Sequence, residues 1–290
     1  MRVLIIGCGY VGLAVAERFL SQGHTVIAMR RTRPENLDPD IHLLQGDITQ
    51  PESLQTMTPD FDWVINTVSS SRGGSEEYRA VYLEGTRNII NWLQDSPLQK
   101  FVYTSSTSVY GQVNGEYVTE NSPTSPQTPT SQILVETEQL ILEKSSSGFP
   151  GVILRVSGIY GPERGHLFHQ YLGSEAKISG SGDRLLNMIH RDDLAGIIEA
   201  ALTRGIPGNI YNATDSCPVT QLEFFQWLSQ ELKKPLPPVE TEPLSSRKRA
   251  TTSKRVSNQR LAELGYLLRY PTFREGYAEE IRRALRRNLN

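Results

Sequence analysis

Three glycines near the N-terminus have the spacing of a phosphate-binding turn. Gly7, Gly9 and Gly12 form a GxGxxG pattern between a β-branched run and a helical pattern. In such a turn the first glycine permits a tight bend, the second lets the backbone approach a pyrophosphate, and the third lets helix and strand pack closely. The first helical N–H groups, those of Tyr10 and Val11, face the phosphates with the positive end of the helix dipole. The pattern predicts a dinucleotide site, and the alternative is a glycine turn without a ligand.

Basic side chains lie where the second predicted strand ends, and their charge indicates whether NAD or NADP binds. The segment Met29-Arg30-Arg31-Thr32-Arg33 has no acidic residue, whereas an NAD site usually has a carboxylate there for the ribose hydroxyls. A guanidinium group binds a 2′-phosphate in forked geometry, and a carboxylate would repel it. We therefore predict NADP rather than NAD, with Arg30 and Arg31 as the main contacts. The alternative is a solvated basic loop.

Further polar side chains follow other predicted strands. Asp47 comes after the third strand, where it could accept a hydrogen bond from the adenine amino group or serve as a turn or cap residue. His190 and Arg191 precede a helix that Asp192 or Asp193 is predicted to cap. His190 and Arg191 are candidates to face the substrate cleft.

Strands alternate with helices along most of the chain. Strands are predicted over 2–6, 24–29, 41–44, 63–68, 101–105, 151–155 and 209–212, and helices over 13–20, 50–57, 76–94, 132–144, 192–202, 221–232 and 272–286. Residues 113–131 and 161–183 are predicted to be irregular. This order is typical of an α/β doubly wound parallel sheet. We expect a dinucleotide-binding domain over 1–160, completed by about 184–214, with 161–183 and 215–290 forming a smaller substrate-binding lobe and a C-terminal helix.

Composition narrows the class of protein. A formal charge of −2 over 290 residues argues against a nucleic-acid-binding chain, which is usually strongly basic. Two cysteines, Cys8 and Cys217, cannot build a disulfide framework or a cysteine-rich zinc site, and they fit a reducing, cytoplasmic location. No apolar run reaches the roughly 18 residues of a membrane span. His166 and His169 lack the carboxylate neighbours of a metal site, so no metal is expected.

Several segments, in order along the chain, resemble the extended short-chain dehydrogenase/reductase family, which includes nucleotide-sugar epimerases and dehydratases. They are Glu84-Gly85-Thr86-Arg87-Asn88, Thr104-Ser105-Ser106-Thr107-Ser108-Val109-Tyr110-Gly111, Arg155-Val156-Ser157-Gly158-Ile159-Tyr160-Gly161-Pro162 and Ile189-His190-Arg191-Asp192-Asp193-Leu194-Ala195. The resemblance implies a Rossmann domain with a small C-terminal lobe that closes over substrate. It also implies that Asn66, Thr67 and Val68 lie beside the cofactor. Ser106 takes the position of the Ser or Thr that hydrogen-bonds the reacting carbonyl.

The same resemblance exposes a departure at the catalytic centre. The family uses a Tyr and a Lys four residues later, whose ammonium lowers the pKa of the phenol so that it exchanges a proton near neutral pH. Here Thr130 and Leu134 take those positions, and none of the twelve tyrosines has Lys four residues on. Ile6 replaces a further family glycine, and Tyr82 replaces an Asn. The chain therefore resembles atypical members known as NAD(P)-dependent epimerase/dehydratase-like proteins.

Two functions are compatible with this pattern. The first is an NADP-dependent oxidoreductase or epimerase-like protein for a small molecule, either a nucleotide sugar or another carbonyl or alcohol compound. Ser106 would polarise the carbonyl; Tyr110 is a candidate general acid, with a packed aromatic as the alternative. The second function is a non-catalytic NAD(P)-binding regulator or redox-reporting module. The basic run over 247–255 either binds a phosphorylated or nucleotide-linked substrate or forms a solvated face. By analogy with relatives, helices 76–94 and 132–144 would form a homodimer contact.

Overall fold

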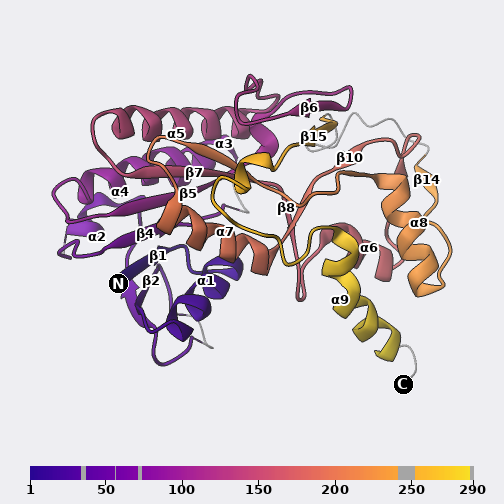
Figure 1. Cartoon of the computed structure of the whole chain (residues 1–290), viewed down its shortest axis with the longest axis horizontal. Helices are drawn as coiled ribbons and strands as arrows, with labels where there is room; N and C mark the ends of the chain where they lie inside the picture. Colours follow the sequence, from indigo (N-terminus) through magenta and orange to yellow (C-terminus); the bar gives the residue numbers. More distant parts are fainter. Residues whose placement is uncertain (34–36, 56, 71–73, 241–251, 288–290) are drawn as a thin grey trace.

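A parallel sheet of seven strands forms the centre of the protein (Figure 1). The structure is a computed structural model, and it describes residues 1–33, 37–55, 57–70, 74–240 and 252–287. In spatial order the strands are β3 (His42–Gln45), β2 (Thr25–Arg30), β1 (Arg2–Ile6), β4 (Trp63–Asn66), β5 (Lys100–Ser106), β7 (Gly151–Val156) and β12 (Ile210–Ala213). The order reverses between β1 and β4, and a doubly wound sheet binds its ligand at such a switch point. The predicted α/β Rossmann fold is confirmed.

Helices cover both faces of this sheet, because successive strand residues point to opposite sides. One face carries α1 (Tyr10–Ser21) and α7 (Arg191–Arg204), and the other carries α2 (Pro51–Gln55), α4 (Gly85–Trp92) and α5 (Pro129–Ser146). In β1, Val3 and Ile5 belong to the first apolar core, and Leu4 and Ile6 belong to the second. A strand that is buried on both faces reads as a continuous apolar run, which is the pattern at the N-terminus.

The helix predicted over 76–94 is interrupted by a wider turn. The structure has α3 (Ser75–Arg79), a π-helical turn over Ala80–Glu84, and then α4. Such turns occur mostly as single insertions in α-helices and often lie at functional sites. Tyr78 and Tyr82 stack across this turn with ring centroids 4.1 Å apart.

The segment predicted to be irregular over 113–131 contains a strand and the start of a helix. β6 (Glu116–Val118) pairs in parallel with β15 (Lys254–Val256), which follows it by more than a hundred residues. The helix α5 begins at Pro129 rather than at 132, and the Thr128 hydroxyl caps it by accepting a hydrogen bond from Ser131 N at 3.1 Å. A proline is well suited to the first helical position, because that position needs no N–H donor. The prediction was therefore wrong at both places.

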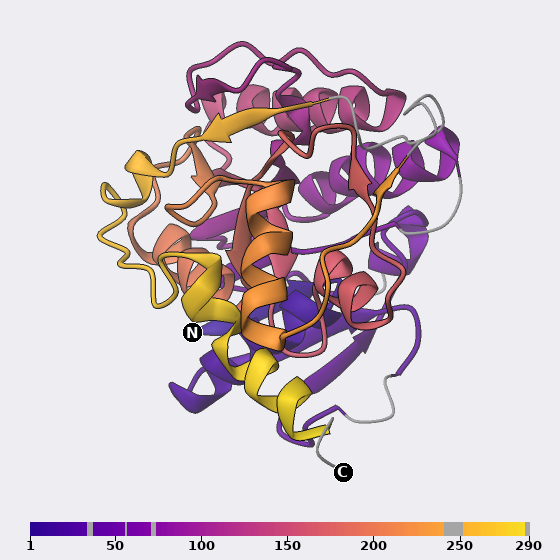
Figure 2. The ribbon, with the colours of Figure 1, turned by 90° about the vertical axis from the view of Figure 1, so that its right-hand side faces the viewer.

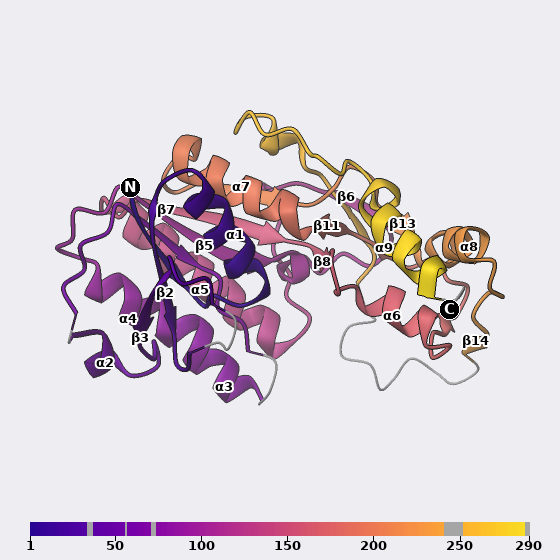
Figure 3. The same ribbon diagram turned by 90° about the horizontal axis from the view of Figure 1, so that it is seen from below.

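A smaller lobe lies beyond the carboxyl ends of β7 and β12 (Figures 2 and 3). Its helices are α6 (His166–Leu172), α8 (Gln221–Leu232) and α9 (Phe273–Arg287), and it has short paired strands: β8 (Gly158–Tyr160) with β11 (Met188–His190), β9 (Ile178–Ser179) with β14 (Val239–Glu240), and β10 (Leu185–Leu186) with β13 (Val219–Thr220). These elements enclose a third apolar core rich in aromatic rings, including Phe168, Phe224 and Tyr277. The helix α6 falls within 161–183, which had been predicted to be irregular. Within the described residues, every helix is too short or too polar to cross a lipid bilayer.

Candidate functional site

The glycine turn is packed tightly at its first and third glycines and open at its second. Gly7 has a φ of 82°, and a Cβ there would lie 2.7 Å from the backbone N and Cα of Val68. A Cβ at Gly12 would lie 3.0 Å from the carbonyl oxygen of Gly7. A Cβ at Gly9 would meet only the Gly7 carbonyl oxygen, at 3.8 Å. Gly7 and Gly12 thus allow β1, α1 and the backbone at Val68 to pack closely. Gly9 leaves its backbone open to a ligand, as a dinucleotide pyrophosphate requires.

Within the described residues, no side chain accepts a hydrogen bond from the N–H groups at the first turn of α1. Gly9 is the N-cap and contributes no side-chain hydrogen bond, and the first helical turn carries no acidic residue. Tyr10 and Val11 are the first two residues of this helix. A helix start of this kind favours an anion, through its unsatisfied donors and the helix dipole.

Arg30 reaches the glycine turn from the end of β2. Its Nη1 donates a hydrogen bond to the carbonyl oxygen of Cys8 at 3.0 Å. Arg31 is exposed, and its carbonyl oxygen accepts a hydrogen bond from Gln45 Nε2 at 3.0 Å. The structure therefore places the Arg30 guanidinium at the turn and leaves the Arg31 side chain in solvent beside it.

Cys8 is a packing residue of this turn. Its side chain is buried in the apolar core, and this burial raises the pKa of the thiol to about 11. A protonated, inaccessible thiol is a poor nucleophile.

The segment that follows β4 lies against the glycine turn. The Thr67 hydroxyl donates to the carbonyl oxygen of Gly7 at 3.0 Å, and Val68 forms the backbone surface against which Gly7 packs. Asn66 is fully buried; its Nδ2 donates to Thr86 Oγ1 at 3.2 Å and its Oδ1 accepts from Val68 N at 3.2 Å. Thr67 and Val68 thus border the candidate cofactor site, and Asn66 holds the backbone of that segment in place.

Asp47 has a turn role in the structure. Its Oδ1 accepts hydrogen bonds from Thr49 N at 2.9 Å and from the Thr49 hydroxyl at 2.8 Å. The backbone N of Asp47 donates to Ser53 Oγ at 3.0 Å. Of the two roles that the sequence left open, these contacts match the turn residue; a contact with adenine stays a prediction.

Ser106 lies at the carboxyl end of β5, partly exposed to solvent. It caps the 3₁₀ turn over Thr107–Val109, and its Oγ accepts a hydrogen bond from Ser108 N at 3.1 Å. Because Oγ is an acceptor in that bond, the hydroxyl proton can be donated to a carbonyl oxygen.

The two positions where the family resemblance would place Tyr and Lys lie on the first turns of α5. The Thr130 hydroxyl is 3.0 Å from the Thr128 hydroxyl at the helix cap. Leu134 is buried in the apolar core that also contains Tyr103 and Val109. These positions therefore hold one hydroxyl and one hydrocarbon side chain.

Tyr110 is fully buried within a polar network, which argues against its predicted role as general acid. Its hydroxyl donates to Asn212 Oδ1 at 2.8 Å and accepts from Arg155 Nη1 at 2.9 Å. Arg155 also pairs with Glu138 of α5 at 2.7 Å, and these two side chains are only 5% and 3% exposed. With its proton donated inside this network, the phenol has none to deliver to a substrate, and we assign it a structural role.

Lys254 and Arg255 end the basic run over 247–255, which was a candidate for substrate binding, and both are at least partly buried. Lys254 Nζ donates to the carbonyl oxygen of Tyr110 at 2.7 Å, and burial lowers the pKa of this amine to about 8. Arg255 Nη1 donates to the carbonyl oxygen of Gly115 at 2.5 Å. Residues 247–251 of the run lie outside the described residues. Lys254 and Arg255 therefore join β15 to the loop around β6 rather than forming a solvated face.

His190 caps α7, where Asp192 or Asp193 had been predicted to do so. His190 Nδ1 accepts a hydrogen bond from Asp192 N at 3.1 Å, and burial lowers the pKa of this imidazole. Asp193 is instead buried and accepts from the Tyr266 hydroxyl at 2.9 Å and from Tyr270 N at 2.9 Å. The cap prediction was wrong because the helix begins one residue earlier than predicted, at Arg191. Arg191 itself lies over the ring of Tyr10 at 5.1 Å.

Asp215 is a buried carboxyl group two residues after β12, and no pattern in the sequence indicates it. Its Oδ1 accepts a hydrogen bond from Cys217 N at 3.1 Å, and its Oδ2 and the hydroxyl of Tyr160 are buried with no hydrogen-bond partner in the described part of the chain. Burial raises the pKa of Asp215 from its ordinary value of 3.8 to about 8. The folded protein therefore keeps this group protonated at neutral pH.

This protonation makes stability depend on pH. Between about pH 4 and pH 8 the folded state holds a proton that the unfolded chain has released, so this group's contribution is full below pH 4 and is lost as the pH rises to 8. The slope approaches about 1.4 kcal/mol per pH unit within that window. Asp215→Asn cannot titrate, so its free energy of unfolding, measured with urea at pH 5, 6, 7 and 8, should fall less steeply than that of the wild type. Parallel curves for the two proteins would contradict this assignment.

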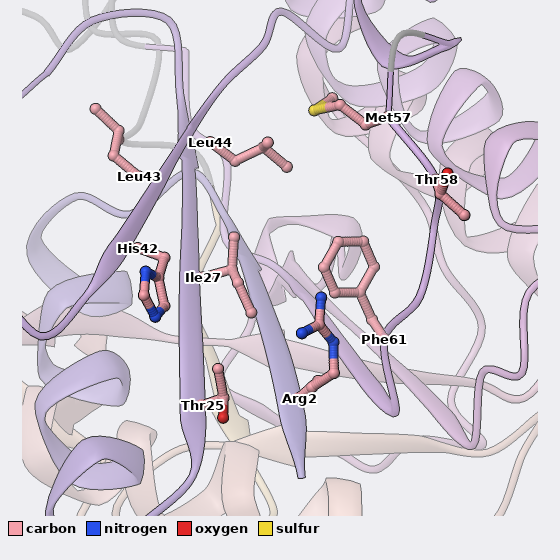
Figure 4. A pocket seen from close by; sticks show the side chains of 9 residues that line it. All are labelled: Arg2, Thr25, Ile27, His42, Leu43, Leu44, Met57, Thr58 and Phe61. Carbon is pink, nitrogen blue, oxygen red and sulfur yellow. The ribbon is translucent and has the colours of Figure 1, made fainter.

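A hollow of about 350 Å³ opens elsewhere on the sheet (Figure 4). It is lined by Arg2, Thr25, Ile27, His42, Leu43, Leu44, Met57, Thr58 and Phe61. Arg2, Thr25 and His42 are the first residues of β1, β2 and β3. The hollow is therefore at the amino ends of these strands, opposite the glycine turn, and does not belong to the candidate cofactor site.

The chain is similar to known proteins in both sequence and structure. A model of the NAD dependent epimerase/dehydratase family matches residues 3–214. A Methylobacillus flagellatus protein, provisionally assigned as an NAD-dependent epimerase/dehydratase, is 30% identical with a TM-score of 0.80, covering 98% of each chain. Protein YeeZ of Escherichia coli K12 is 25% identical over 281 residues, which cover 93% of this chain and 96% of YeeZ.

Two other relatives have a named activity. A 3-beta-hydroxysteroid dehydrogenase of Mycolicibacterium neoaurum is 30% identical over 252 residues, which cover 77% of this chain and 68% of that protein. The dTDP-glucose 4,6-dehydratase DesIV of Streptomyces venezuelae, solved with NAD bound, has a TM-score of 0.85 over 99% of this chain and 98% of its own. At 21% identity the likeness to DesIV shows a shared fold only.

Proposed function

The chain belongs to the NAD-dependent epimerase/dehydratase family, and on that premise we propose that it is an NADP-dependent oxidoreductase acting on a nucleotide sugar or another carbonyl or alcohol compound. The observation that carries the proposal is the guanidinium of Arg30, which is hydrogen-bonded to the glycine turn where the second strand ends. No acidic residue occupies positions 29–33, so nothing in that segment repels a 2′-phosphate.

The residues of the turn fit a dinucleotide. The open backbone at Gly9 and the donors of Tyr10 and Val11 would hold the pyrophosphate, and Arg30 would hold the 2′-phosphate, with Arg31 beside it. Thr67 and Val68 would border the nicotinamide half. When bound, the coenzyme supplies a hydride donor or acceptor.

Ser106 is the residue that we propose for the reacting carbonyl. Its partly exposed hydroxyl would donate a hydrogen bond to the carbonyl oxygen and stabilise the negative charge that develops there. Thr130 and Leu134 provide no acid of suitable pKa, and general acid–base assistance is typically worth about 10²- to 10⁴-fold in rate. We therefore expect slow turnover that depends on positioning and on Ser106.

A second candidate function is a non-catalytic NAD(P)-binding regulator or redox-reporting module. The observation that favours it is the buried Leu134 at the position where an ammonium group would be needed. Such a protein would bind the coenzyme through the same glycine turn and turn over no substrate.

Coenzyme preference is tested by titrating the protein with NADPH and with NADH in a calorimeter at modest salt. We expect tighter binding of NADPH, and a loss of that preference in Arg30→Gln, because a charge-assisted hydrogen bond contributes about 1.5–3 kcal/mol. Arg87→Gln removes an exposed arginine of α4 that pairs with Glu84, and serves as the control. A wild-type protein that prefers NADH would contradict the NADP assignment.

Turnover separates the two candidate functions. Wild type and Ser106→Ala are incubated with NADPH and a panel of carbonyl compounds, including nucleotide 4-ketosugars, and the absorbance of NADPH is followed. We expect slow oxidation by the wild type and a fall of about 10²-fold or more in Ser106→Ala, the usual loss of one such hydrogen-bond donor. Tight NADPH binding without turnover on any compound would favour the regulator instead.

A further inference from the structure

Two arginines from different elements meet on one aromatic ring at the start of α1. The guanidinium carbon of Arg164 is 4.9 Å from the ring centroid of Tyr10, and that of Arg191 is 5.1 Å from the same centroid. The Tyr10 hydroxyl donates to the carbonyl oxygen of Pro162 at 2.9 Å. Residues 10, 164 and 191 are thus brought together only in the folded chain.

The backbone around these side chains is closely defined. Gly161 and Arg164 exchange backbone hydrogen bonds of 3.1 and 3.0 Å, which close a tight turn before α6. Gly161 has a φ of 144°, and a Cβ there would lie 3.0 Å from the Tyr10 hydroxyl and 3.2 Å from His190 Nε2. Arg191 is the first residue of α7, directly after its His190 cap. Arg164 therefore extends from a hydrogen-bonded turn, and Arg191 extends from the first turn of a helix.

Around the Tyr10 ring, the charged side chains of the described residues include more arginines than carboxylates. Arg191 pairs with Asp192 at 3.0 Å, whereas Arg164 makes no ion pair within the described residues. The nearby Glu280 of α9 pairs with Arg283 at 3.2 Å. Each guanidinium lies against the Tyr10 ring, whose face attracts a cation, and the N–H donors of Arg164 have no acidic partner in the described part of the chain.

We propose that Arg164 and Arg191, supported by the ring of Tyr10, form a binding site for a phosphate or diphosphate group. Planar guanidinium groups suit phosphoryl oxygens because each can donate two parallel hydrogen bonds. Tyr10 is also the first residue of α1, so its ring projects from the helix start that follows the glycine turn. The phosphoryl group belongs either to the coenzyme or to the substrate, and the coenzyme case rests on the function proposed above.

The test uses inorganic pyrophosphate as the probe, titrated calorimetrically into the free protein and into protein saturated with NADPH. The variants are Arg164→Gln, Arg191→Gln, their combination and Arg164→Lys, with Arg87→Gln as the control. We expect pyrophosphate to bind the wild type and each Gln substitution to weaken that binding about tenfold or more. Arg164→Lys keeps the charge and loses the forked geometry, so it should fall between wild type and Arg164→Gln, which a purely structural role of Arg164 would not produce.

The two sources of the phosphoryl group give different results. If it belongs to the coenzyme, NADPH displaces pyrophosphate and the double variant loses NADPH affinity as well. If it belongs to the substrate, pyrophosphate still binds the NADPH-saturated wild type and the double variant keeps its NADPH affinity. Either result supports the site.

The site would be rejected if the double variant bound pyrophosphate as tightly as the wild type and Arg87→Gln, or if the wild type bound none in either state. The proposed function can fail separately from the anion site. If the wild type bound pyrophosphate through these arginines but bound neither NADPH nor NADH, the proposed function would be wrong and the anion site would still be supported. Thermal unfolding followed by circular dichroism checks that all variants fold alike.

Discussion

Gly7→Ala is expected to lower the free energy of unfolding by about 2–5 kcal/mol and to abolish coenzyme binding. The φ of 82° at this position costs an L-residue about 1–2 kcal/mol. The added Cβ would also lie 2.7 Å from the backbone N and Cα of Val68, which cannot swing aside as a side-chain end can. Overpacking of this kind costs about 1–3 kcal/mol more. Urea unfolding followed by circular dichroism measures the loss.

Gly23→Ala is the matched control for this loss. Gly23 has a similar φ of 78°, and a Cβ there would meet nothing within 4 Å. It should show only the conformational part of the cost, about 1–2 kcal/mol. Equal losses in Gly7→Ala and Gly23→Ala would mean that the approach of the Val68 segment contributes nothing.

Gly9→Ala separates folding from binding within the same turn. A Cβ at Gly9 would meet only the Gly7 carbonyl oxygen at 3.8 Å, and φ is −100°, which alanine adopts. We expect near wild-type unfolding but at least roughly tenfold weaker NADPH binding, because the methyl group would stand where the phosphate approaches the backbone. Unchanged NADPH affinity would show that the ligand does not bind at this turn.

Glu138→Gln is expected to destabilise the protein by about 3–5 kcal/mol. Glu138 pairs with Arg155 at 2.7 Å, and both side chains are almost fully buried. Arg155 also donates to Glu138 through Nε, at 3.1 and 3.2 Å to the two carboxylate oxygens. The glutamine keeps one acceptor oxygen but carries no charge and turns an amide NH2 toward the Arg155 donors, so the buried guanidinium loses its counter-charge and keeps only neutral partners, among them the Tyr110 hydroxyl and a backbone oxygen. The free energy of unfolding from urea titration measures the effect.

The chain offers a control on the same helix. Glu136 of α5 pairs with Arg79 at 2.7 Å on the surface, where an ion pair contributes little, so Glu136→Gln should unfold almost as the wild type does. Combining Glu138→Leu with Arg155→Met removes both charges and should recover much of the stability lost in Glu138→Gln. If Glu136→Gln and Glu138→Gln proved equally mild, the buried pair would not be a main support of the interface between α5 and β7.

The parts of the site that could be predicted from sequence lie close together along the chain. Gly7, Gly9 and Gly12 span six residues, so their backbone roles follow from local geometry once a strand precedes them and a helix follows. Arg30 could be predicted because it ends the strand that pairs with β1, and parallel strands end at the same edge of the sheet. The hydrogen bond from Arg30 to the Cys8 carbonyl oxygen depends on the side-chain conformation as well, and the structure supplies it.

Local sequence patterns were least informative where distant segments meet. Tyr110 reads as a candidate acid beside Ser106, but Arg155 and Asn212 surround its hydroxyl in the folded protein. The strand β6 was missed because its partner β15 lies far along the chain, and three residues carry too little periodicity to be recognised alone. Local patterns contain no information about either contact.

The sequence by itself determined the alternation of strands and helices, the phosphate-binding turn and the absence of a Tyr–Lys pair at the usual spacing, because each depends on residues within a few positions of one another. Tertiary structure alone decided that Tyr110 belongs to the core, that Asp215 is buried and that Arg164 and Arg191 share the ring of Tyr10. Burial and the meeting of charges depend on which distant segments pack together. Strands β7 and β12 supply the partners of Tyr110, and α7 and the turn before α6 bring the two arginines to Tyr10.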